Sequence, residues 1–448
     1  MPAQLQKTAL LCLLCCMAGL PCTVVAQKTQ QPKLICGPMQ GHTTHSEMNI
    51  WLLCKHAQLV EMELYLPQQE NLNLSQTVIP DTAVALGGYA PVQLRFEGLL
   101  PDTVYQYRLL LNKEVVKKGT VRTLQPPGAA NFSFIAGSCA WMPLSFWEDI
   151  QPGITNATYR SAAKSGADFM IWLGDDLYFR NGDWNSYAAM FARYVTMRSF
   201  KPIHPLLEAM PQYAIWDDHD FGPNNSNSAN NPAKDWALQL FKLFWANPAY
   251  GIPAAPGVFY NFKYQDAEFF LLDDRYNKDM PHQHTNGSMF GAEQWNWLAE
   301  QLQNSSATFK FVVCGVQMLI ENSGAEGLKE FPAEQQRFLD MLEEKQIKGV
   351  VLLSGDRHFA ELYHFPRPQS YDLYEVTTSP LSAITTGILL STSKGTQRAV
   401  PKTKWKKPNF ARFNITGSPN NRICTIYLCN KKGKTVWQKS WTQTDLGY

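Results

Sequence analysis

The sequence has few charged residues and almost no excess of either sign. Charged side chains make up 17% of the 448 residues, and the formal net charge is +2. A balance this close to neutral gives no electrostatic basis for binding nucleic acid or a strongly acidic partner. The chain also lacks internal repeats and long low-complexity stretches. Its 45% hydrophobic content is enough for two or three ordinary domains with real cores.

After its first stretch, the chain lacks any segment that resembles a membrane helix. Residues 1–26 carry a basic Lys7, a short apolar centre and small residues ending at Ala26, the pattern of a signal peptide. The apolar centre is too short for a comfortable membrane span. A lipoprotein anchor is the alternative, but the residues before Cys16 and Cys22 do not form a convincing lipidation box. We therefore expect soluble export, to a periplasm or outside the cell, with no transmembrane segment after signal removal.

Cysteine is scarce once this stretch is removed. The remaining six are Cys36, Cys54, Cys139, Cys314, Cys424 and Cys429. In an oxidising compartment Cys36 could pair with Cys54, or Cys424 with Cys429, and buried free thiols are the alternative. Cys314 lies within the apolar run FVVCGV, which favours a small core residue.

The remaining sequence shows two different patterns of predicted secondary structure. Residues 33–126 contain short strand-like segments separated by Pro, Asp, Asn or Gly, and the segment FEGLLPDTVYQYRLLLN resembles the fibronectin-type-III pattern. This predicts a small N-terminal β-sandwich domain. In residues 131–448 strands alternate with helices, which is typical of a layered α/β domain. We expect the strands after about Asn409 to pack on that core.

Five apolar, strand-like runs end in side chains that can bind metal ions. The runs are FSFIAGSCAW, FMIWLGDDLY, YAIWDDHDFGPNN, FKFVVCGVQM and VVLLSGDRHFAEL. In open α/β sheets, chemistry gathers at the carboxyl ends of such buried strands. The repeated pattern therefore predicts a polynuclear metal site and favours a metal-dependent hydrolase. The candidate ligands are Cys139, Asp175, Tyr178, Asp218, Asn224, Gln317, Asp356 and His358.

The first two runs offer an unusual mixture of donors. The carboxylate of Asp175 has two oxygens and can bridge two cations, although it could also cap the following turn. The thiol of Cys139 in an exported protein risks oxidation unless it is buried, paired or ligated, and simple burial is the alternative. The phenolate of Tyr178 suits trivalent iron, and a core aromatic is the alternative.

The WDDHD run places three carboxylates around one imidazole, which is costly without cations. Asp218 is the metal-ligand candidate. His219 is predicted to donate a proton or hydrogen bond to a leaving or non-bridging oxygen, while Asp220 holds its other ring nitrogen. Asn224 or Asn225 adds an amide oxygen of the kind that calcium accepts, and a solvated Asn-rich loop is the alternative.

The last two runs and two arginines complete the predicted site. Asp356 and His358 are two apart, so in extended backbone they point the same way and serve one metal each. Gln317 is a candidate for a further oxygen ligand. Arg180 and Arg275 are candidates for a substrate-binding clamp, because a guanidinium matches phosphate oxygens, and ordinary salt bridges are the alternative.

Taken in order, the motifs GSC, GDxxY, WDDHD followed by Asn, LDDRY and SGDRH resemble the alkaline phosphatase D (PhoD-like) branch of the calcineurin-like metallophosphoesterases. The resemblance covers nearly the whole chain after the signal. It implies an α/β fold, with a four-layer αββα core preceded by a β-sandwich. It also implies hydrolysis of phosphate mono- or diesters by a metal-activated water or oxide, with Fe(3+) and Ca(2+) as the metals and other divalent ions as alternatives.

The resemblance also assigns roles to residues of this chain. The implied iron ligands are Cys139, Asp175, Tyr178 and His358. The implied calcium ligands are Asp175, Asp218 and Asp356, with Asn224 or Asn225. His219 matches the catalytic histidine, and Asp220 and Arg275 join it as catalytic candidates. The chain departs from better-known members at Phe179 and Arg180, where an acidic residue is usual, and at Asp220, where glutamate is usual.

Two other hypotheses remain open at this stage. Within enzymes, the alternative is a phospholipase-D-like or cell-wall-polymer phosphodiesterase. In a different class, the alternative is a metal-stabilised binding protein without activity, in which the β-sandwich is the working module.

Overall fold

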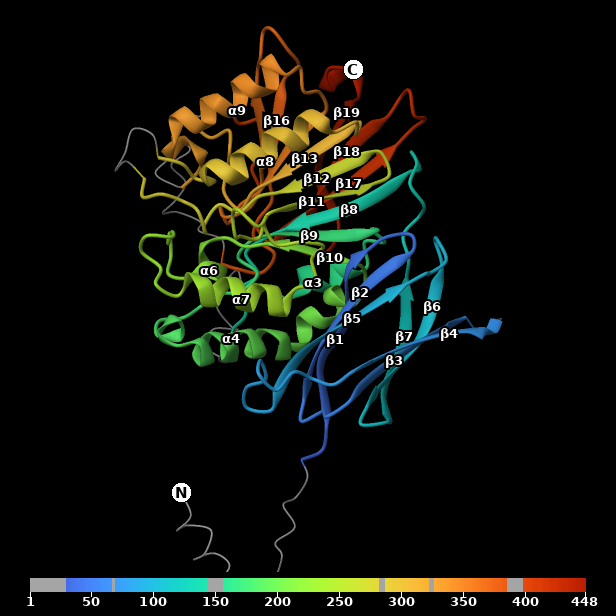
Figure 1. The fold of residues 1–448 in the computed structure, drawn as a ribbon. Coiled ribbons are helices and arrows are strands. Elements are labelled where there is room, and N and C mark those ends of the chain that lie inside the picture. The colour runs from blue at the N-terminus through green and yellow to red at the C-terminus, as the bar shows by residue number, and fades with distance from the viewer. Residues whose placement is uncertain (1–29, 67–68, 144–155, 282–286, 322–325, 385–397) are drawn as a thin grey trace, which may run out of the picture. The chain divides into compact units, whose positions relative to one another are not determined.

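The computed structural model describes residues 30–66, 69–143, 156–281, 287–321, 326–384 and 398–448. Pro32–Tyr448 form one compact unit, and Figure 1 shows its fold. The predicted signal peptide, residues 1–26, lies outside the described residues. None of the helices in the described part is both long and apolar enough to span a bilayer.

The N-terminal strands form two antiparallel sheets that face each other. One sheet has the order β1-β2-β5, with β1 (Lys33–Thr43), β2 (Glu47–Lys55) and β5 (Tyr89–Glu97). The other has the order β4-β3-β6-β7, with β3 (Val60–Leu66), β4 (Gln69–Val78), β6 (Val104–Leu111) and β7 (Glu114–Arg122). Alternate residues of β6, such as Tyr107 and Leu109, are buried against Ile50 and Leu52 of β2 in one apolar cluster. The predicted β-sandwich is confirmed.

Two six-stranded sheets make up the centre of the remaining chain. The first has the order β10-β9-β8-β17-β18-β19, with β8 (Phe132–Gly137), β9 (Phe169–Leu173), β10 (Gln212–Ile215), β17 (Asn409–Thr416), β18 (Ile423–Asn430) and β19 (Thr435–Thr442). The second has the order β11-β12-β13-β14-β16-β15, with β11 (Tyr260–Tyr264), β12 (Ala267–Leu271), β13 (Phe309–Val313), β14 (Val350–Ser354), β15 (Glu361–Phe365) and β16 (Leu373–Thr377).

Aromatic side chains hold the two sheets together. Phe134 and Phe169 of the first sheet stack with their ring centroids 5.4 Å apart. Phe269 and Phe311 of the second sheet each meet Phe134 edge to face at 5.0 Å. These rings belong to one large buried cluster that contains residues of both sheets. Edge-to-face and offset contacts of this kind add to the free energy of burying apolar area.

Helices cover the outer faces of the two sheets. Those on the side of the first sheet are α3 (Ala157–Ala163), α4 (Tyr187–Ser199), α5 (His204–Leu207), α6 (Asp218–Phe221) and α7 (Lys234–Phe244). Those on the second are α8 (Gly291–Asn304) and α9 (Pro332–Glu344) (Figure 1). Short 3-10 turns cover Asp183–Asn185, Lys201–Ile203, Leu328–Glu330 and Thr444–Leu446. The order helix, sheet, sheet, helix is the predicted four-layer αββα core.

All six described cysteines are buried free thiols. Cys36 packs in the large central cluster, whereas Cys54 packs inside the β-sandwich, so the two side chains face different cores. Cys424 and Cys429 lie five residues apart on β18, and a strand rises by about 3.3 Å per residue. That separation exceeds the reach of a disulfide. Of the two alternatives for these cysteines, the buried free thiol is the one observed.

Candidate metal centre

The loops after five strands meet at one edge of the two sheets. β8, β9 and β10 are parallel neighbours in the first sheet, and β13 and β14 are parallel neighbours in the second. Their carboxyl ends therefore lead into loops that carry Cys139, Asp175, Asp218, Gln317 and Asp356. The loops after β9 and β10 come close together at Gly174, whose φ is +85°. A Cβ atom at this position would lie 2.6 Å from the Cβ atom of Asp217. Only glycine allows these two loops to come so near.

Four different donor types form the first group. The Cys139 thiol and the Tyr178 hydroxyl both donate to Oδ2 of Asp175, at 3.4 and 3.0 Å. The Tyr178 hydroxyl also lies 3.4 Å from Nε2 of His358. One ligand atom from each of Cys139, Asp175 and His358 falls within 4.8 Å of the other two. A thiol, a carboxyl, a phenol and an imidazole therefore converge from three separate parts of the chain, with Cys139 36 residues before Asp175 and His358 180 residues after Tyr178.

The imidazole of His358 is held in the form that a metal ion requires. Its Nδ1 atom lies 2.7 Å from the carbonyl oxygen of Ile384. Because a carbonyl oxygen only accepts hydrogen bonds, Nδ1 carries the proton. The lone pair is then on Nε2, which faces Tyr178 and the rest of the group.

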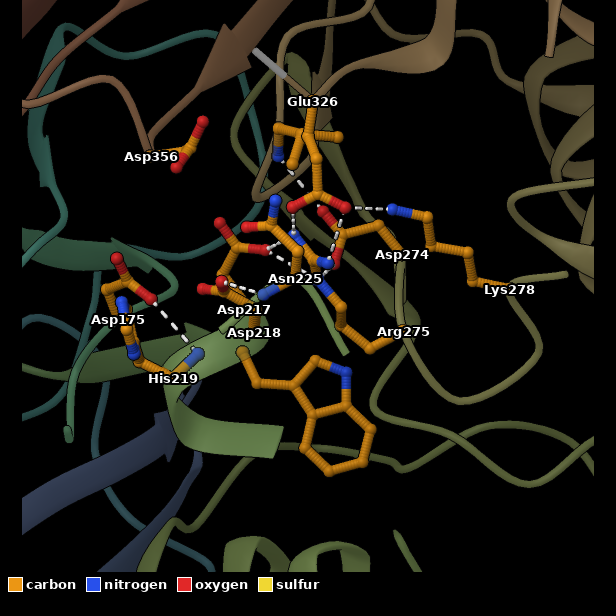
Figure 2. A network of polar contacts seen from close by, with 12 residues as sticks. Asp175, Asp217, Asp218, His219, Asn225, Asp274, Arg275, Lys278, Glu326 and Asp356 are labelled. Atoms are coloured by element: carbon orange, nitrogen blue, oxygen red, sulfur yellow. Dashed lines mark hydrogen bonds and ion pairs between the residues drawn. The ribbon is translucent and has the colours of Figure 1, made fainter. Parts of the chain in front are cut away.

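The second group shares Asp175 with the first. Ligand atoms of Asp175, Asp218 and His219 lie within 4.8 Å of one another. The backbone N–H of His219 donates to Oδ1 of Asp175, as Figure 2 shows, and that of Asn225 donates to Oδ2 of Asp218 at 2.7 Å. The other Asp218 oxygen, Oδ1, is buried without a hydrogen-bond partner among the described residues. Such an oxygen is suited to a cation.

Acidic groups accumulate in this region, and Asp175 forms no ion pair with Lys or Arg among the described residues. Burial, together with the charges of Asp218 and Asp217, raises the pKa of Asp175 well above its ordinary value. Burial also raises the pKa of Cys139, and the charges of Asp175 and Asp356 raise it further. The thiolate of Cys139 and the carboxylate of Asp175 are therefore unfavourable unless positive charge is supplied. A bound cation supplies it and reverses these shifts.

Asp356 lies apart from both groups. Its carboxylate is 4.0 Å from the guanidinium of Arg357 and 26% exposed, and Figure 2 shows it on a loop separate from those of Asp175 and Asp218. Burial raises its pKa to about 7, an effect that Arg357 opposes. Its carboxylate thus acts on the two groups through its charge.

The backbone at the site is left-handed at five positions that are not glycine. The φ angles are +56° at Cys139, +55° at Asp175, +57° at Asn225, +61° at Asp356 and +52° at His358. The prediction that Asp356 and His358 share extended backbone is therefore wrong, because the chain turns at each of them. Non-glycine residues in this region cost about 1 kcal/mol or more each, and such strain gathers at functional sites.

Comparison with known proteins identifies the family. The model of a family described as PhoD-like phosphatase matches residues 134–423, which is more than half of the chain. The chain belongs to the PhoD-like phosphatase family. Alkaline phosphatase D of Bacillus subtilis (strain 168) is 25% identical over 319 residues, covering 60% of this chain. The match spans 53% of that curated relative, about half of its length.

Solved structures agree with this fold. A structure of PhoD aligns with a TM-score of 0.73 and 17% identity, over 91% of this chain and 90% of the other. The purple acid phosphatase PPD1 from yellow lupin (Lupinus luteus) seeds aligns with a TM-score of 0.64 and 12% identity, over 91% of this chain and 75% of the other. At these identities the similarity shows the fold of this PhoD-like protein, a metallophosphoesterase-type arrangement.

Arg275 does not take its predicted place as a catalytic or phosphate-clamping residue. Its side chain is 0% exposed. Its Nε donates to Oδ1 of Asp217 at 2.7 Å, and its two Nη atoms donate to the two oxygens of Glu326 at 3.0 and 3.1 Å. Lys278 forms a second ion pair with Glu326 (Figure 2). The donors that would bind phosphate oxygens are already used inside the protein, so the prediction is corrected.

Asp220 also has a different role from the predicted one. Its Oδ1 accepts from the backbone N–H of Leu177 at 2.7 Å, and its Oδ2 accepts from that of Asp217 at 3.1 Å. With Asp217 it forms a capping box at the start of α6. Both oxygens are used by the backbone, so Asp220 does not hold the imidazole of His219.

The asparagine prediction needs a shift of one residue. Asn224 and Asn225 are both exposed, and the Nδ2 of Asn224 donates to Oδ1 of Asn225 at 2.7 Å. Asn225, whose backbone N–H reaches Asp218, is the residue at the centre. Gln317 is buried and its Nε2 donates to Thr377 at 2.9 Å, while its Oε1 has no hydrogen-bond partner among the described residues, so its role as an oxygen ligand stays a prediction.

Arg180 lies at the rim of the first group. Its guanidinium is 3.6 Å from the ring centroid of Trp141, and that ring meets Tyr178 edge to face at 5.0 Å. One Nη atom donates to the carbonyl oxygen of Tyr178 at 3.2 Å. This position is compatible with the predicted contact to substrate.

Glu326 and Lys278 are the residues that sequence reasoning missed. Both belong to segments without a strand-end pattern, ENSGAEG and RYNKD. The only signal available was indirect, because a buried arginine in LDDRY requires carboxylates to pair with.

Proposed function

We propose that this PhoD-like protein hydrolyses phosphate esters at a centre of two metal ions bridged by Asp175. The observation that carries the proposal is the membership of Asp175 in both ligand groups. Asp175 would help to hold a cation in each group, and two such cations would supply stabilisation of the attacking and leaving oxygens in phosphoryl transfer.

The donor chemistry supports a different metal on each side of Asp175. Thiolate, phenolate and imidazole ligands suit iron, so we assign Fe(3+) to Cys139, Asp175, Tyr178 and His358. Carboxylate and amide oxygens suit calcium, so we assign Ca(2+) to Asp175 and Asp218 and propose that Asp356 and Asn225, which lie outside the two compact groups, complete its ligands. When bound, the two cations would supply Lewis-acid stabilisation of the charge on the phosphoryl oxygens.

Protein side chains would donate a proton to the leaving group and bind the phosphate. The ring of His219 lies 4.4 Å from that of Tyr178 and beside Asp175, where it would donate a proton or hydrogen bond to the leaving oxygen. Burial lowers the pKa of this imidazole, and the neighbouring Asp218 opposes that effect. Arg180, held flat against Trp141, would contact a non-bridging phosphate oxygen.

We also propose that the protein is exported. Support comes from residues 1–26, whose basic start, apolar centre and small residues match a signal peptide. The amino-terminal sequence of the protein purified from the periplasm or medium tests this, and an intact Met1 in that material would contradict it.

Metal analysis and two model substrates test the enzymatic proposal. We expect the purified protein to contain iron and calcium and to hydrolyse p-nitrophenyl phosphate, bis-p-nitrophenyl phosphate or both. Chelation should abolish turnover, and adding back the two metals should restore it. Finding neither metal nor turnover would remove the proposal.

A further inference from the structure

A basic cavity of about 610 Å³ lies beside helix α3 and the turn between β18 and β19. It shares no lining residue with the metal centre, and none of its lining residues is acidic. Its cationic lining residues are Arg160, Lys164, Arg412, Lys431 and Lys432. Its volume lies in the range of about 300–1,000 Å³ that is usual for ligand pockets.

The positive charges of this cavity have no acidic partner in the part of the chain that the structure describes. Arg160 and Lys164 are four residues apart on and just after α3, a spacing at which like charges repel. No carboxylate lies within 4.0 Å of any of the five cations among the residues that the structure describes. Arg412 has only a neutral partner for its Nε, the amide oxygen of Asn414 at 3.1 Å. The cavity therefore concentrates positive charge that a ligand can neutralise.

The walls of the cavity are fixed relative to each other. The hydroxyl of Ser161 on α3 donates to the carbonyl oxygen of Lys431 in the turn at 2.8 Å. Phe410 and Cys429, on paired strands, are buried and form the base. Because the cavity is already formed, ligand binding costs little free energy for ordering its walls.

The arrangement of the charges points to the ligand. The cavity contains two guanidinium groups, which bind phosphate oxygens bidentately, and ammonium groups lie on both of its walls. One ligand with several phosphate groups can therefore contact all of these cations. None of the large hydrophobic side chains exposed in the described residues lines the cavity, which disfavours a membrane surface. We propose that this cavity is a second, non-catalytic site that binds a soluble chain of phosphate groups. The proposal rests on the cavity alone and does not require the proposed function.

Titration calorimetry with sodium tripolyphosphate at low ionic strength tests this inference. The key variant combines Arg160→Gln and Lys432→Gln, one exposed cation from each wall. We expect its dissociation constant to rise at least about tenfold, because each lost contact is a charge-assisted hydrogen bond. The matched control combines Lys118→Gln and Lys345→Gln, which removes the same charge from exposed positions elsewhere and should leave binding unchanged.

The variant Asp175→Asn separates the cavity from the metal centre and should still bind tripolyphosphate. Loss of binding in that variant, with normal binding in the cavity variant, would overturn the proposal. Equal weakening in both charge variants would also overturn it, because the attraction would then be diffuse. Equally tight binding of polyglutamate would refute selectivity for phosphate. Binding of phosphatidylglycerol vesicles without binding of tripolyphosphate would replace the ligand with a membrane surface.

Discussion

Asp217 and Asp218 are consecutive in the sequence, yet they serve two different regions of the molecule. Asp217 belongs to what we call the ion-pair network, whose members are Asp217, Asp274, Arg275, Lys278 and Glu326. Asp218 belongs to the metal centre, whose members are Cys139, Asp175, Tyr178, Asp218, His219 and His358. Both regions are buried and rich in carboxylates, and they differ in where the positive charge comes from.

In the ion-pair network the protein supplies its own cations. Arg275 alone reaches Asp217 and both oxygens of Glu326, so each of these two carboxylates has an ion-pair partner. In the metal centre, neither Asp175 nor Asp218 forms an ion pair with Lys or Arg among the described residues, and burial together with neighbouring carboxylates raises the pKa of Asp175. We infer that the network stabilises the fold, whereas the centre is suited to receive ions.

Asp175→Asn is expected to produce the largest effect, and it concerns the metal centre. An amide cannot bridge two cations as a carboxylate does, so turnover of p-nitrophenyl phosphate should fall at least about a thousandfold. Iron and calcium contents should both drop, because one side chain serves both groups. Steady-state kinetics and metal analysis measure the two effects.

The matched control for that change is Asp340→Asn on the exposed side of α9, where the carboxylate bonds only to Gln336. It should leave turnover and metal content unchanged. Near-normal activity of Asp175→Asn would exclude the bridging role.

Sequence patterns predicted the fold and the edge of the sheets at which the site lies, because strand ends are marked locally by apolar runs and polar side chains. They did not distinguish the two roles of the WDDHD carboxylates, which depend on distant partners. Glu326, which occupies the guanidinium of Arg275, is 51 residues away in the chain. The left-handed turns at Asp356 and His358 have no local signal either, since neither residue is glycine.

Arg275→Met is expected to act on stability. Removing the guanidinium leaves Asp217 and Glu326 buried with too little positive charge, which typically costs about 3–5 kcal/mol of unfolding free energy. Urea unfolding of the metal-loaded protein measures it. The control is Arg95→Gln, an exposed ion pair with Glu47, which should cost about 1 kcal/mol or less. Equal effects of the two changes would mean that the network does not stabilise the fold.

Metal removal is expected to lower stability by less than Arg275→Met does. The size of this loss should depend on which region a variant changes. Ions that bind only the folded protein stabilise it by about 2.7 kcal/mol at a hundredfold excess over Kd. Chelation should therefore lower the Tm of the wild type. It should lower that of Arg275→Met by a similar amount, because this change lies outside the metal centre. It should leave Asp175→Asn almost unaffected. Calorimetric scans with and without chelator measure these shifts, and a full shift in Asp175→Asn would show that the ions bind elsewhere.

Asn225, on the loop that follows α6, is expected to give the smallest effect. Its φ of +57° is left-handed, and its backbone N–H holds Oδ2 of Asp218. Asn225→Ala should cost about 1–2 kcal/mol of stability through backbone strain, whereas Asn225→Gly should not. Asn420→Ala, at an exposed position outside the metal centre, is the control and should leave stability unchanged.

Calcium affinity measured on the same Asn225 variants separates the two ways in which this residue can act. If the side-chain oxygen binds calcium, Asn225→Gly will lose affinity while keeping its stability, since glycine adopts the left-handed backbone freely. If only the backbone matters, Asn225→Gly will behave as the wild type in both measurements. The second result would remove Asn225 from the proposed calcium ligands. It would leave the carboxylates of Asp175, Asp218 and Asp356 as the proposed calcium ligands.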